Sequence, residues 1–545
     1  MTRSTSILVF AMLIVSSSLL LGAGIHHEHD WGDDFAAYIM QARSLVEGNS
    51  SALLAETRFM IEQSSSFWVP VAYPWGFPTL LSPLYALFGV NMLALKMVNL
   101  VCYLGFLAVV WFAWPRCHSN TSRFVFVALF AWNSFLQEFM NQVLSDIPFL
   151  LFSTLSIILI GRVVIELRWL ISQSWDPVLL GLVITASCFI RANGFLLVVI
   201  LILTLFIRAM QHAREAHGMT SSTGAQLRSL VSRVPRLRAT HLLGVLIVAV
   251  WVWQVLWSKE QYFFSGDASL THVTMALLLE RLHYNIELPT QFFTGVPHPD
   301  LVYGATIPLA MIGMVRRRGS DYRMIWYAVL TVLLYILTLP TTQGLRYLFP
   351  ILPLYIHFVL VGLEQCLGVT NHNRTTPRRW VRWVPAFLVL FYFAETAVVN
   401  AALTHAKERP PVAGPYLPTA EQAFSFISMN TEPDSVIVFF KPRAMKLFTG
   451  RQAIVIKKAD QLNRGDYLCV YLRKDASSQL TSNDIARFLG EGRLRQMYEN
   501  VDFRVYRINK DQDTLEVSYG SGPILLPGAE IQLPIVRAMD SLLGR

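Results

Sequence analysis

Apolar residues in this chain fall in long blocks rather than at the intervals of amphipathic helices. A stretch of ~20 apolar residues spans the hydrocarbon core of a membrane as a helix, and the chain repeats such stretches many times. The pattern predicts an α-helical polytopic membrane protein with about eleven spans. The predicted spans centre on residues 7–24, 91–113, 123–139, 147–165, 178–191, 194–208, 241–257, 301–315, 324–340, 347–364 and 383–400.

Two apolar segments need separate treatment. The first, 7–24, follows Arg3 and shows no small-residue cleavage site followed by a soluble domain, so we expect an uncleaved anchor rather than a signal peptide. Segment 76–90 is apolar but rich in Pro and Gly. We expect it to form an interfacial or re-entrant piece that leads into the second span.

Loop charges predict the orientation of the spans. Loop 208–240 carries six arginines and one acid, loop 366–382 carries four arginines, and the turn at 316–318 is Arg-Arg-Arg. Such basic loops are typical of the cytoplasmic side. Loop 26–75 instead carries seven acids and two arginines, and loop 258–300 is also net acidic. Counting spans from a cytoplasmic N-terminus places both acidic loops outside.

The end of the chain reads differently from the apolar blocks. We divide the chain into a membrane domain at 1–405, a small soluble α/β domain at 416–510 and a tail at 511–545. Thr419 and Gln422 have the spacing of a capping box, which predicts a helix running to about Met429. The other expected elements are short strands at 435–440, 453–456 and 467–472 and a helix at 483–489. An odd number of spans places this domain outside.

Composition agrees with a membrane protein and limits its partners. The 545-residue chain is 54% hydrophobic and only 15% charged, whereas a soluble domain averages about 25% charged residues. The net charge of +9 comes from basic residues in short loops between apolar blocks, so we expect no nucleic-acid partner. The five cysteines show no CxxC spacing, which argues against a disulfide framework.

Charged residues at the ends of the spans are candidates for function, because a charge in hydrocarbon is costly to retain. Asp33 and Asp34 follow the first span, and Asp146 begins the fourth. Arg191 lies between the fifth and sixth spans, and Arg346 begins the tenth. In the predicted topology all of these residues lie on the outer side.

Each candidate also has an ordinary structural interpretation. Asp33, Asp34 and Asp146 could cap helices, since Asp is favoured at a helix N-terminus. Arg191 could extend towards lipid headgroups, and Arg346 could be an interfacial anchor. Histidines 26 and 29, in the run His-His-Glu-His-Asp, either bind a divalent metal ion or are plain solvated side chains.

Several segments together resemble the GT-C membrane glycosyltransferases, which include protein O-mannosyltransferases and lipid A aminoarabinose transferases. The family's first outer loop has an acidic pair and a Tyr before a helix, as in Trp31-Gly-Asp-Asp-Phe-Ala-Ala-Tyr38. The other similar segments are Tyr73-Pro-Trp-Gly, Ser145-Asp-Ile-Pro, Ile190-Arg-Ala-Asn-Gly, Arg346-Tyr-Leu-Phe-Pro, Pro433-Asp-Ser-Val-Ile, Lys441-Pro-Arg and Leu447-Phe-Thr-Gly-Arg. The chain differs in having Asp-Asp for the family's Asp-Glu pair and in placing Tyr38 four residues after Asp34 rather than three.

The resemblance implies a GT-C fold and a sugar transfer that uses a polyprenyl-phosphate donor. Asp34 or Asp33 would be the general base of an inverting displacement, and Asp146 would be a second acid that orients the acceptor or the base. Arg191 and Arg346 would bind the donor phosphate. The implied substrate-binding residues are Tyr38, Tyr73 and Tyr347. No cofactor is required, although His26 and His29 could hold a divalent ion, as some family members do.

The sequence therefore favours a membrane glycosyltransferase acting on the outer face of a bacterial inner membrane. The sugar could be mannose, aminoarabinose or another hexose or pentose, and the acceptor could be a lipid, a glycan or a protein. An alternative is a transporter or flippase for polyprenyl-linked lipid, although the chain shows no internal repeat. A scaffold protein that binds through its outer domain is a third hypothesis. An oligosaccharyltransferase is disfavoured because the tail has no Trp-Trp-Asp motif.

Overall fold

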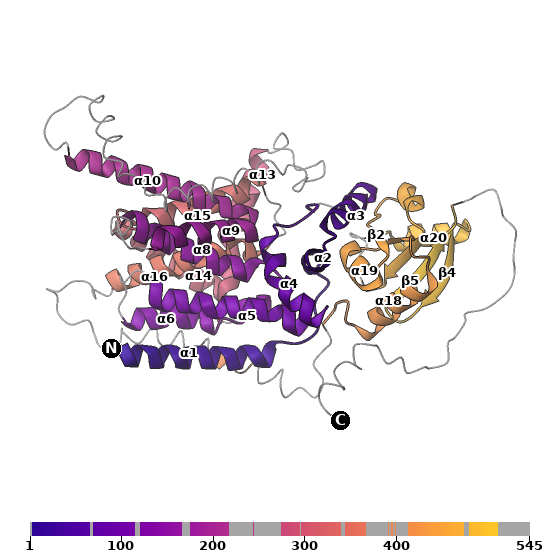
Figure 1. Cartoon of the computed structure of the whole chain (residues 1–545), viewed down its shortest axis with the longest axis horizontal. Helices are drawn as coiled ribbons and strands as arrows, with labels where there is room; N and C mark the ends of the chain where they lie inside the picture. The colour runs from indigo at the N-terminus through magenta and orange to yellow at the C-terminus, as the bar shows by residue number, and fades with distance from the viewer. Residues whose placement is uncertain are drawn as a thin grey trace.

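The chain forms a helical lobe and a smaller lobe built around a β-sheet (Figure 1). The computed structural model describes residues 3–65, 69–114, 120–165, 175–216, 244, 274–294, 296–338, 344–366, 391, 394–395, 398, 412–473 and 479–510. Between the two lobes lie α2 (Asp34–Glu47) and α3 (Ser50–Gln63), which belong to the predicted first outer loop.

The helical lobe contains long apolar helices that run in roughly the same direction (Figure 1). Its α-helices are α1 (Arg3–Gly24), α4 (Gly76–Phe88), α5 (Met92–Ala108), α6 (Asn120–Ala131), α7 (Ser134–Met140), α8 (Asp146–Ile160), α9 (Asp176–Ile190), α10 (Phe195–Ala216), α13 (Met275–Glu287), α14 (Pro299–Arg317), α15 (Tyr322–Thr338) and α16 (Leu352–Cys366). Turns of π-helix, η1 (Val109–Ala113) and η2 (Gly161–Ile165), continue α5 and α8. The short 3₁₀ segments are η4 (Ala192–Gly194), η6 (Leu288–Phe293) and η7 (Leu345–Ile351).

The helices confirm a membrane protein. Within the described ranges, three helices are long and apolar enough to cross a membrane, namely Met92–Ala113, Asp146–Ile165 and Leu345–Cys366. Six shorter apolar helices are Ser4–Leu19, Gly76–Phe88, Asn120–Ala131, Asp176–Ile190, Ala192–Arg208 and Tyr322–Leu337. Nearly all of the predicted spans 241–257 and 383–400 lies outside the described residues. The total of about eleven spans stays a prediction.

The predicted span 123–139 is not one continuous helix. The chain breaks at Asn133, whose side chain accepts a hydrogen bond from the backbone N–H of Leu136 and so caps α7. The same amide donates to the carbonyl of Phe292 at 2.9 Å. Asn is a favoured N-cap residue, and this local preference overrides the apolar run around it.

Close helix contacts in the lobe depend on small residues. Helices α14 and α16 cross so tightly that a β-carbon built at Gly362 would lie 1.9 Å from the carbonyl oxygen of Leu309. Small residues allow helices in a membrane to approach each other in this way, because apolar burial drives little association there.

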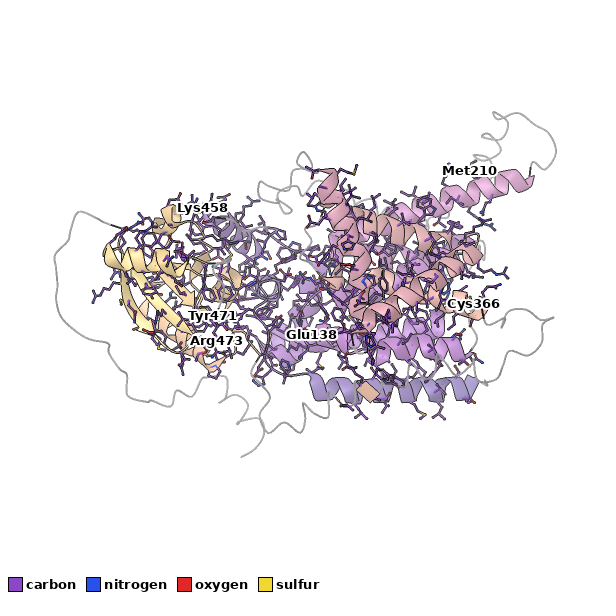
Figure 2. All side chains as sticks on the ribbon, turned by 180° about the vertical axis from the view of Figure 1, so that it is seen from behind. Glu138, Met210, Cys366, Lys458, Tyr471 and Arg473 are labelled. Carbon is purple, nitrogen blue, oxygen red and sulfur yellow. The ribbon has the colours of Figure 1, made fainter. Side chains whose placement is uncertain are left out.

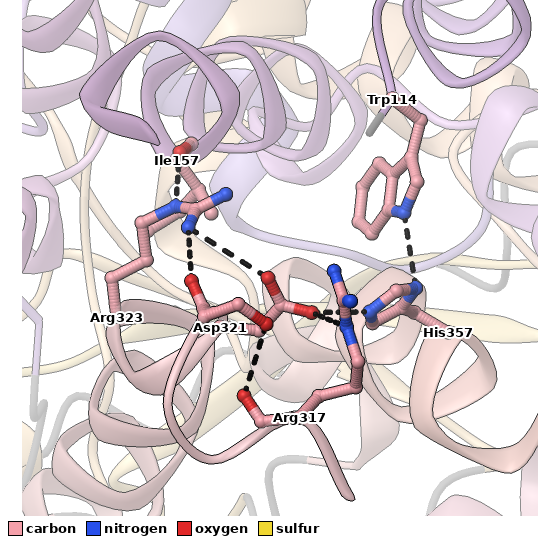
Figure 3. Close-up of polar contacts among 7 residues, drawn as sticks. Trp114, Ile157, Arg317, Asp321, Arg323 and His357 are labelled. Atoms are coloured by element: carbon pink, nitrogen blue, oxygen red, sulfur yellow. Dashed lines mark hydrogen bonds and ion pairs between the residues drawn. The ribbon is translucent and has the colours of Figure 1, made fainter. Parts of the chain in front are cut away.

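A buried ionic cluster lies at the turn between α14 and α15 (Figure 3). The Asp321 carboxylate accepts from Arg317 Nε at 2.7 Å and lies 3.2 Å from His357 Nε2. Nδ1 of His357 accepts from the Trp114 indole N–H at 3.2 Å, which makes Nε2 the nitrogen that donates to Asp321. Arg323 reaches Asp321 at 3.9 Å and donates to the Ile157 carbonyl. The cluster thus ties the turn to α8, α16 and the end of η1.

The second lobe is a three-layer α/β unit. Its elements are α18 (Pro418–Asn430), β1 (Val436–Val438), α19 (Pro442–Thr449), β2 (Gln452–Ile454), η9 (Ala459–Arg464), β3 (Tyr467–Tyr471), α20 (Ser482–Gly490), β4 (Leu494–Glu499) and β5 (Phe503–Ile508). The strand order is β2-β1-β3-β5-β4, with parallel pairing of β1 to β2 and β3 and antiparallel pairing of β5 to β3 and β4. Alternate residues of β3 face two apolar clusters, one packed against α18 and α19 and the other against α20.

The strands and helices predicted for this lobe are confirmed within a few residues, but the predicted capping box is wrong. The N-cap residue of α18 is Leu417, not Thr419. The Thr419 hydroxyl instead donates to Asp502 Oδ2 at 2.6 Å. The side chain therefore joins the helix to the segment before β5 rather than capping it.

The first outer loop is joined to the edge of the sheet. Strand β2 lies at one edge, and the segment after α3 runs along it. The Ser65 N–H donates to the Val455 carbonyl at 2.8 Å, and the Val455 N–H donates to Ser64 Oγ at 2.9 Å. This pairing covers part of an edge that would otherwise be open.

The sheet lobe and the starts of the Arg-rich loops lie at opposite ends of the helical lobe. Met210 lies near the start of loop 208–240, and Cys366 begins loop 366–382. Both lie towards the end of the helical lobe that is remote from the sheet (Figure 2). The N-terminus lies at the same end (Figure 1). Glu138 lies near the end that faces the sheet (Figure 2). This arrangement separates the Arg-rich loop starts from the sheet lobe, as the loop charges predict.

Candidate functional site

The two adjacent aspartates at the beginning of α2 face different parts of the molecule. Asp33 is 8% exposed and accepts a hydrogen bond from the backbone N–H of Arg443 at 3.1 Å. Asp34 has a side chain that is 27% exposed and points towards Arg346 and Tyr73. Asp33 occupies the N-cap position of α2, yet its side chain does not cap that helix. The local capping interpretation therefore does not explain either carboxylate.

Asp34 is held on both oxygens. The Tyr73 hydroxyl donates to Oδ1 at 2.6 Å, and the two terminal nitrogens of Arg346 lie 3.3 and 3.2 Å from Oδ2. Burial opposes ionisation of Asp34, but Arg346, the Tyr73 hydroxyl and Arg443 together hold its pKa below the usual value. Asp34 is therefore a carboxylate at neutral pH.

Asp33 has the opposite electrostatic balance. Burial raises the pKa of Asp33, and the neighbouring charge of Asp34 raises it further, while Arg443 and Lys441 offset this only in part. Asp33 is buried against the sheet lobe and already accepts the Arg443 N–H, so it is poorly placed to take a proton from a substrate. The structure thus distinguishes two residues that the sequence leaves equivalent.

A second pair of opposite charges lies beside the first. Asp146, 3% exposed, forms an ion pair with Nη1 of Arg191. The guanidinium groups of Arg191 and Arg346 both lie against the ring of Tyr347, at 4.9 and 5.1 Å from its centroid. Asp146 is the first residue of α8 and forms this pair instead of a side-chain cap. Two carboxylates and two guanidiniums thus meet around one aromatic ring.

Short connections between helices place these charges. Arg191 is the residue between α9 and η4, and Arg346 lies in η7, just before α16. The N-terminus of α4 packs against the end of α9, where a β-carbon at Gly76 would meet the backbone of Phe189 at 2.6 Å. Only glycine permits this approach, which brings the N-terminus of α4 against the end of α9, next to Ile190.

Tyr38 lies behind the site. It is buried, and its hydroxyl forms a hydrogen bond with the Ser145 hydroxyl at 2.9 Å. Its ring contacts those of Tyr73 and Phe77 at 4.7 and 4.9 Å between centroids. The Tyr38 ring therefore packs against the Tyr73 ring and helps to hold it in place. Direct contact between Tyr38 and a substrate stays a prediction.

The ring of His29 is held by protein groups. His29 is buried; its Nε2 accepts from the Val143 N–H at 3.1 Å, and its Nδ1 lies 2.9 Å from Asp30 Oδ1. Both ring nitrogens are therefore engaged within the protein. His26 donates its backbone N–H to the Asn141 side chain. Across the parts of the chain that the structure describes, no group of three or more His, Cys, Asp or Glu side chains could hold a metal ion.

Three functional candidates escaped the sequence analysis. Arg443 lies in the second lobe (residues 412–510, the sheet lobe, also called the tail lobe below) and contacts Tyr73 and Asp33. In the sequence, its Lys-Pro-Arg motif appears only as part of the family resemblance. Lys96 is fully buried in α5 and donates to the carbonyls of His26 and Glu28 at 2.7 and 2.6 Å. Tyr335 in α15 accepts from the Asn193 amide, and its ring meets that of Tyr347 edge to face. In the sequence, Lys96 is the only charged residue in the apolar block 91–113, and a charge retained in such a block indicates a functional or buried polar site.

No protein-family model matches the sequence, and no curated protein matches it either. Solved structures do match its fold. ArnT from Cupriavidus metallidurans in the apo state has a TM-score of 0.56 at 11% identity, over 93% of this chain and 98% of that chain. The same protein bound to undecaprenyl phosphate has a TM-score of 0.55 at 12% identity, over 94% and 99% of the two chains.

The archaeal oligosaccharyltransferase AglB from Archaeoglobus fulgidus is similar as well. In complex with an inhibitory peptide and a dolichol-phosphate, it has a TM-score of 0.50 at 10% identity, over 93% of this chain and 74% of that chain. ArnT and AglB are GT-C glycosyltransferases. The chain therefore has the GT-C membrane fold, which confirms the fold implied by its sequence motifs.

Proposed function

We propose that the chain is a glycosyltransferase that moves a sugar from a polyprenyl-phosphate donor to a hydroxyl group of a lipid, glycan or protein acceptor. The fold supports this proposal, since ArnT is known bound to undecaprenyl phosphate and AglB in complex with a dolichol-phosphate. The loop charges and the opposite positions of the Arg-rich loop starts and the sheet lobe support a reaction on the outer face of the membrane. In a bacterial inner membrane, residues 416–510 would then be a soluble periplasmic domain.

One observation carries the proposal. Asp34 is ionised and partly exposed, and it lies within hydrogen-bond distance of Arg346, beside a second guanidinium on the Tyr347 ring. Sugar transfer from a lipid phosphate needs a base for the acceptor hydroxyl and positive charge for the departing phosphate. The site supplies both within one cluster.

The proposed step is a single displacement at the anomeric carbon. The acceptor oxygen forms a bond to this carbon as the bond from the carbon to the phosphate oxygen breaks, so the configuration inverts. The hydroxyl proton passes to the Asp34 carboxylate. The electron pair of the broken bond stays on the polyprenyl phosphate, whose charge Arg191 and Arg346 stabilise. Asp146 orients Arg191 through their ion pair.

The pairing of Asp34 with Arg346 suggests how the base becomes active. A carboxylate with a lowered pKa is a weak base. A donor phosphate would compete with Asp34 for the same guanidinium, because Arg binds phosphate and carboxylate with the same fork of donors. Loss of this partner would raise the pKa of Asp34 when the donor is bound. The acceptor would then meet a stronger base.

Purified full-length protein, radiolabelled polyprenyl-phosphate sugars and a membrane extract as acceptor provide the test. Wild type should transfer label, Asp34→Asn should lose about 10²- to 10⁴-fold, and Asp33→Asn should lose less than about tenfold. If wild type transfers nothing from a broad donor panel but equilibrates labelled lipid across proteoliposomes, the transporter hypothesis replaces the transferase.

A further inference from the structure

Four consecutive residues of the first outer loop join the tail lobe to the site. The Trp31 ring inserts into an aromatic cluster of the tail lobe, at 5.2 Å from Phe440 and 5.6 Å from Tyr471 between ring centroids. Gly32 follows, then Asp33, which faces the tail lobe, and Asp34, which faces Arg346. The beginning of α2 is therefore fastened on one side and open to the site on the other.

Helix α19 of the tail lobe meets this segment with its N-terminus. Pro442 is its first residue, and the N–H of Arg443 points at Asp33 Oδ1. The exposed amides of a helix N-terminus favour a negatively charged partner. Asp33 therefore acts as a cap for a helix that lies 410 positions away in the chain.

The side chain of Arg443 continues past Asp33 to Tyr73. Arg443 is 1% exposed, and its Nη2 donates to the Pro70 carbonyl at 2.6 Å. Its Nη1 lies 3.4 Å from the Tyr73 hydroxyl, and its guanidinium lies 5.2 Å from the centroid of the Tyr73 ring. Tyr73 in turn donates to Asp34 Oδ1. A continuous chain of contacts thus runs from the tail lobe to the proposed base.

We propose that Arg443 is a positioning residue for the transfer reaction, and that the tail lobe thereby completes the site by holding Tyr73 and the Asp34 carboxylate in place. The inference rests on the proposed function, because it assigns Asp34 the role of base. Arg443 acts through Tyr73 and does not itself contact a reacting atom. Removal of the Arg443 side chain should leave the membrane helices intact and misplace the Asp34 carboxylate.

The charges around Asp34 set the direction of the expected effect. Arg346 and Arg443 are the cations that lower the pKa of Asp34, and the Tyr73 hydrogen bond acts in the same direction. The other titratable groups that interact electrostatically with Asp34 are Asp33, Tyr38 and Tyr347. Loss of Arg443 removes a positive charge and loosens the Tyr73 hydrogen bond, so the acid limb of the rate should move to higher pH.

The variants Arg443→Met, Tyr73→Phe and the double variant test whether Arg443 works through Tyr73. We expect Arg443→Met to lower kcat about 10- to 100-fold with little change in the donor KM. If the two residues act in series, the double variant should lose no more than the worse single variant. Arg443→Lys should recover only part of the rate, because Lys lacks the planar fork that spans the Pro70 carbonyl and the Tyr73 ring.

Two matched controls separate positioning from loss of structure. Arg451 lies in the same lobe and donates to Thr431 and to the Ser428 carbonyl, all within that lobe. Lys446 forms an ion pair across the lobe boundary with Glu56 at 3.0 Å, without reaching Tyr73. We expect Arg451→Met and Lys446→Met to keep the wild-type pH profile. A profile that moves equally in all three variants would overturn the proposal.

A second measurement needs no transfer activity. With 3-fluorotyrosine at position 73, the ¹⁹F resonance should follow the ionisation of Asp34 through the hydrogen bond between them. In Arg443→Met protein the inflection should move upward by about 0.5–1 pH unit, and in Arg451→Met protein it should not move. An unmoved inflection in Arg443→Met would overturn the inference. If wild type transfers no sugar, the proposed function fails, and the titration alone still decides whether Arg443 controls Asp34.

Discussion

Asp34 and Arg346 lie 312 positions apart in the chain and form an ion pair, with Nη2 of the arginine 3.2 Å from Oδ2 of the aspartate. The pair closes the site between the first outer loop and the segment that leads into α16. It also means that the proposed base and the proposed phosphate ligand satisfy each other while no donor is bound.

The two aspartates should differ sharply when each is replaced by asparagine. Asp34→Asn removes the proton acceptor, and we expect transfer to fall about 10²- to 10⁴-fold. Asp33→Asn keeps an oxygen that can accept the Arg443 N–H and removes a charge that burial disfavours, so the loss should stay below about tenfold. Label transfer measured at saturating donor, with protein folding checked by size-exclusion chromatography, gives the comparison. Equal losses would contradict the assignment of the base.

Arg346 should determine donor affinity. Arg346→Lys keeps a positive charge but loses the two-nitrogen contact, and we expect the donor KM to rise about tenfold; Arg346→Ala should raise it about 100-fold. The control is Arg281→Ala in α13, since Arg281 contacts the carbonyls of Ile336 and Leu337 instead of the site. An unchanged donor KM in Arg346→Ala protein would rule out phosphate binding by this residue.

The pH dependence of the reaction should reflect the lowered pKa of Asp34. Above the ordinary aspartate pKa of ~3.9, a group with a lowered pKa stays ionised, so kcat/KM of wild type should be flat on the acid side down to about pH 4. Tyr73→Phe removes a hydrogen bond that favours the ionised form, which raises the pKa of Asp34 and moves the acid limb upward. A limb that moves downward, or a rate that does not change, would show that Tyr73 does not act on the base.

The Asp321 cluster should matter for stability and not for chemistry. Asp321→Ala leaves Arg317 and His357 without the buried carboxylate between them, and loss of one partner of a buried ionic network costs about 3–5 kcal/mol. We expect a clearly lower Tm in detergent and an unchanged rate per folded molecule. Arg487→Ala, which breaks an exposed pair with Asp484, should change the unfolding free energy by less than about 1 kcal/mol.

Chelation of divalent ions should have little effect. Both ring nitrogens of His29 are engaged by Val143 and Asp30, so transfer in excess EDTA should stay within about twofold of the untreated rate. Loss of activity in EDTA with recovery on added Mg²⁺ or Mn²⁺ would restore a metal-dependent reaction and place the ion elsewhere in the site.

Much of the site could be predicted from charges at the ends of apolar blocks. Asp34, Asp146, Arg191 and Arg346 were expected to share one side, and the structure brings all four together around Tyr347. Membrane helices are predicted well from sequence, because a long apolar block can hardly form anything other than a membrane-spanning helix. Charges at the ends of these blocks then lie on one of only two sides.

Other features of the site and the fold could not be predicted, because they depend on contacts between residues that lie far apart in the sequence. Asp33 and Asp34 are neighbours with the same side chain, and only their distant partners, Arg443 and Arg346, distinguish them. Thr419 has the spacing of a capping box, but Asp502 takes its hydroxyl. Strand β4 escaped detection because it lies at the sheet edge and is largely exposed, so its apolar pattern is weak.

The hydrogen bond between Asp33 and Arg443 also has a consequence for biosynthesis. A ribosome that adds about 5–20 residues per second needs roughly 20–80 s to pass from one partner to the other. During that time the first outer loop has left the ribosome without the helix end, the sheet edge and the aromatic cluster that later hold it. The loop therefore depends on the surrounding membrane helices, or on a chaperone, until residues 412–510 emerge. Chains that end prematurely would insert in the membrane yet remain inactive.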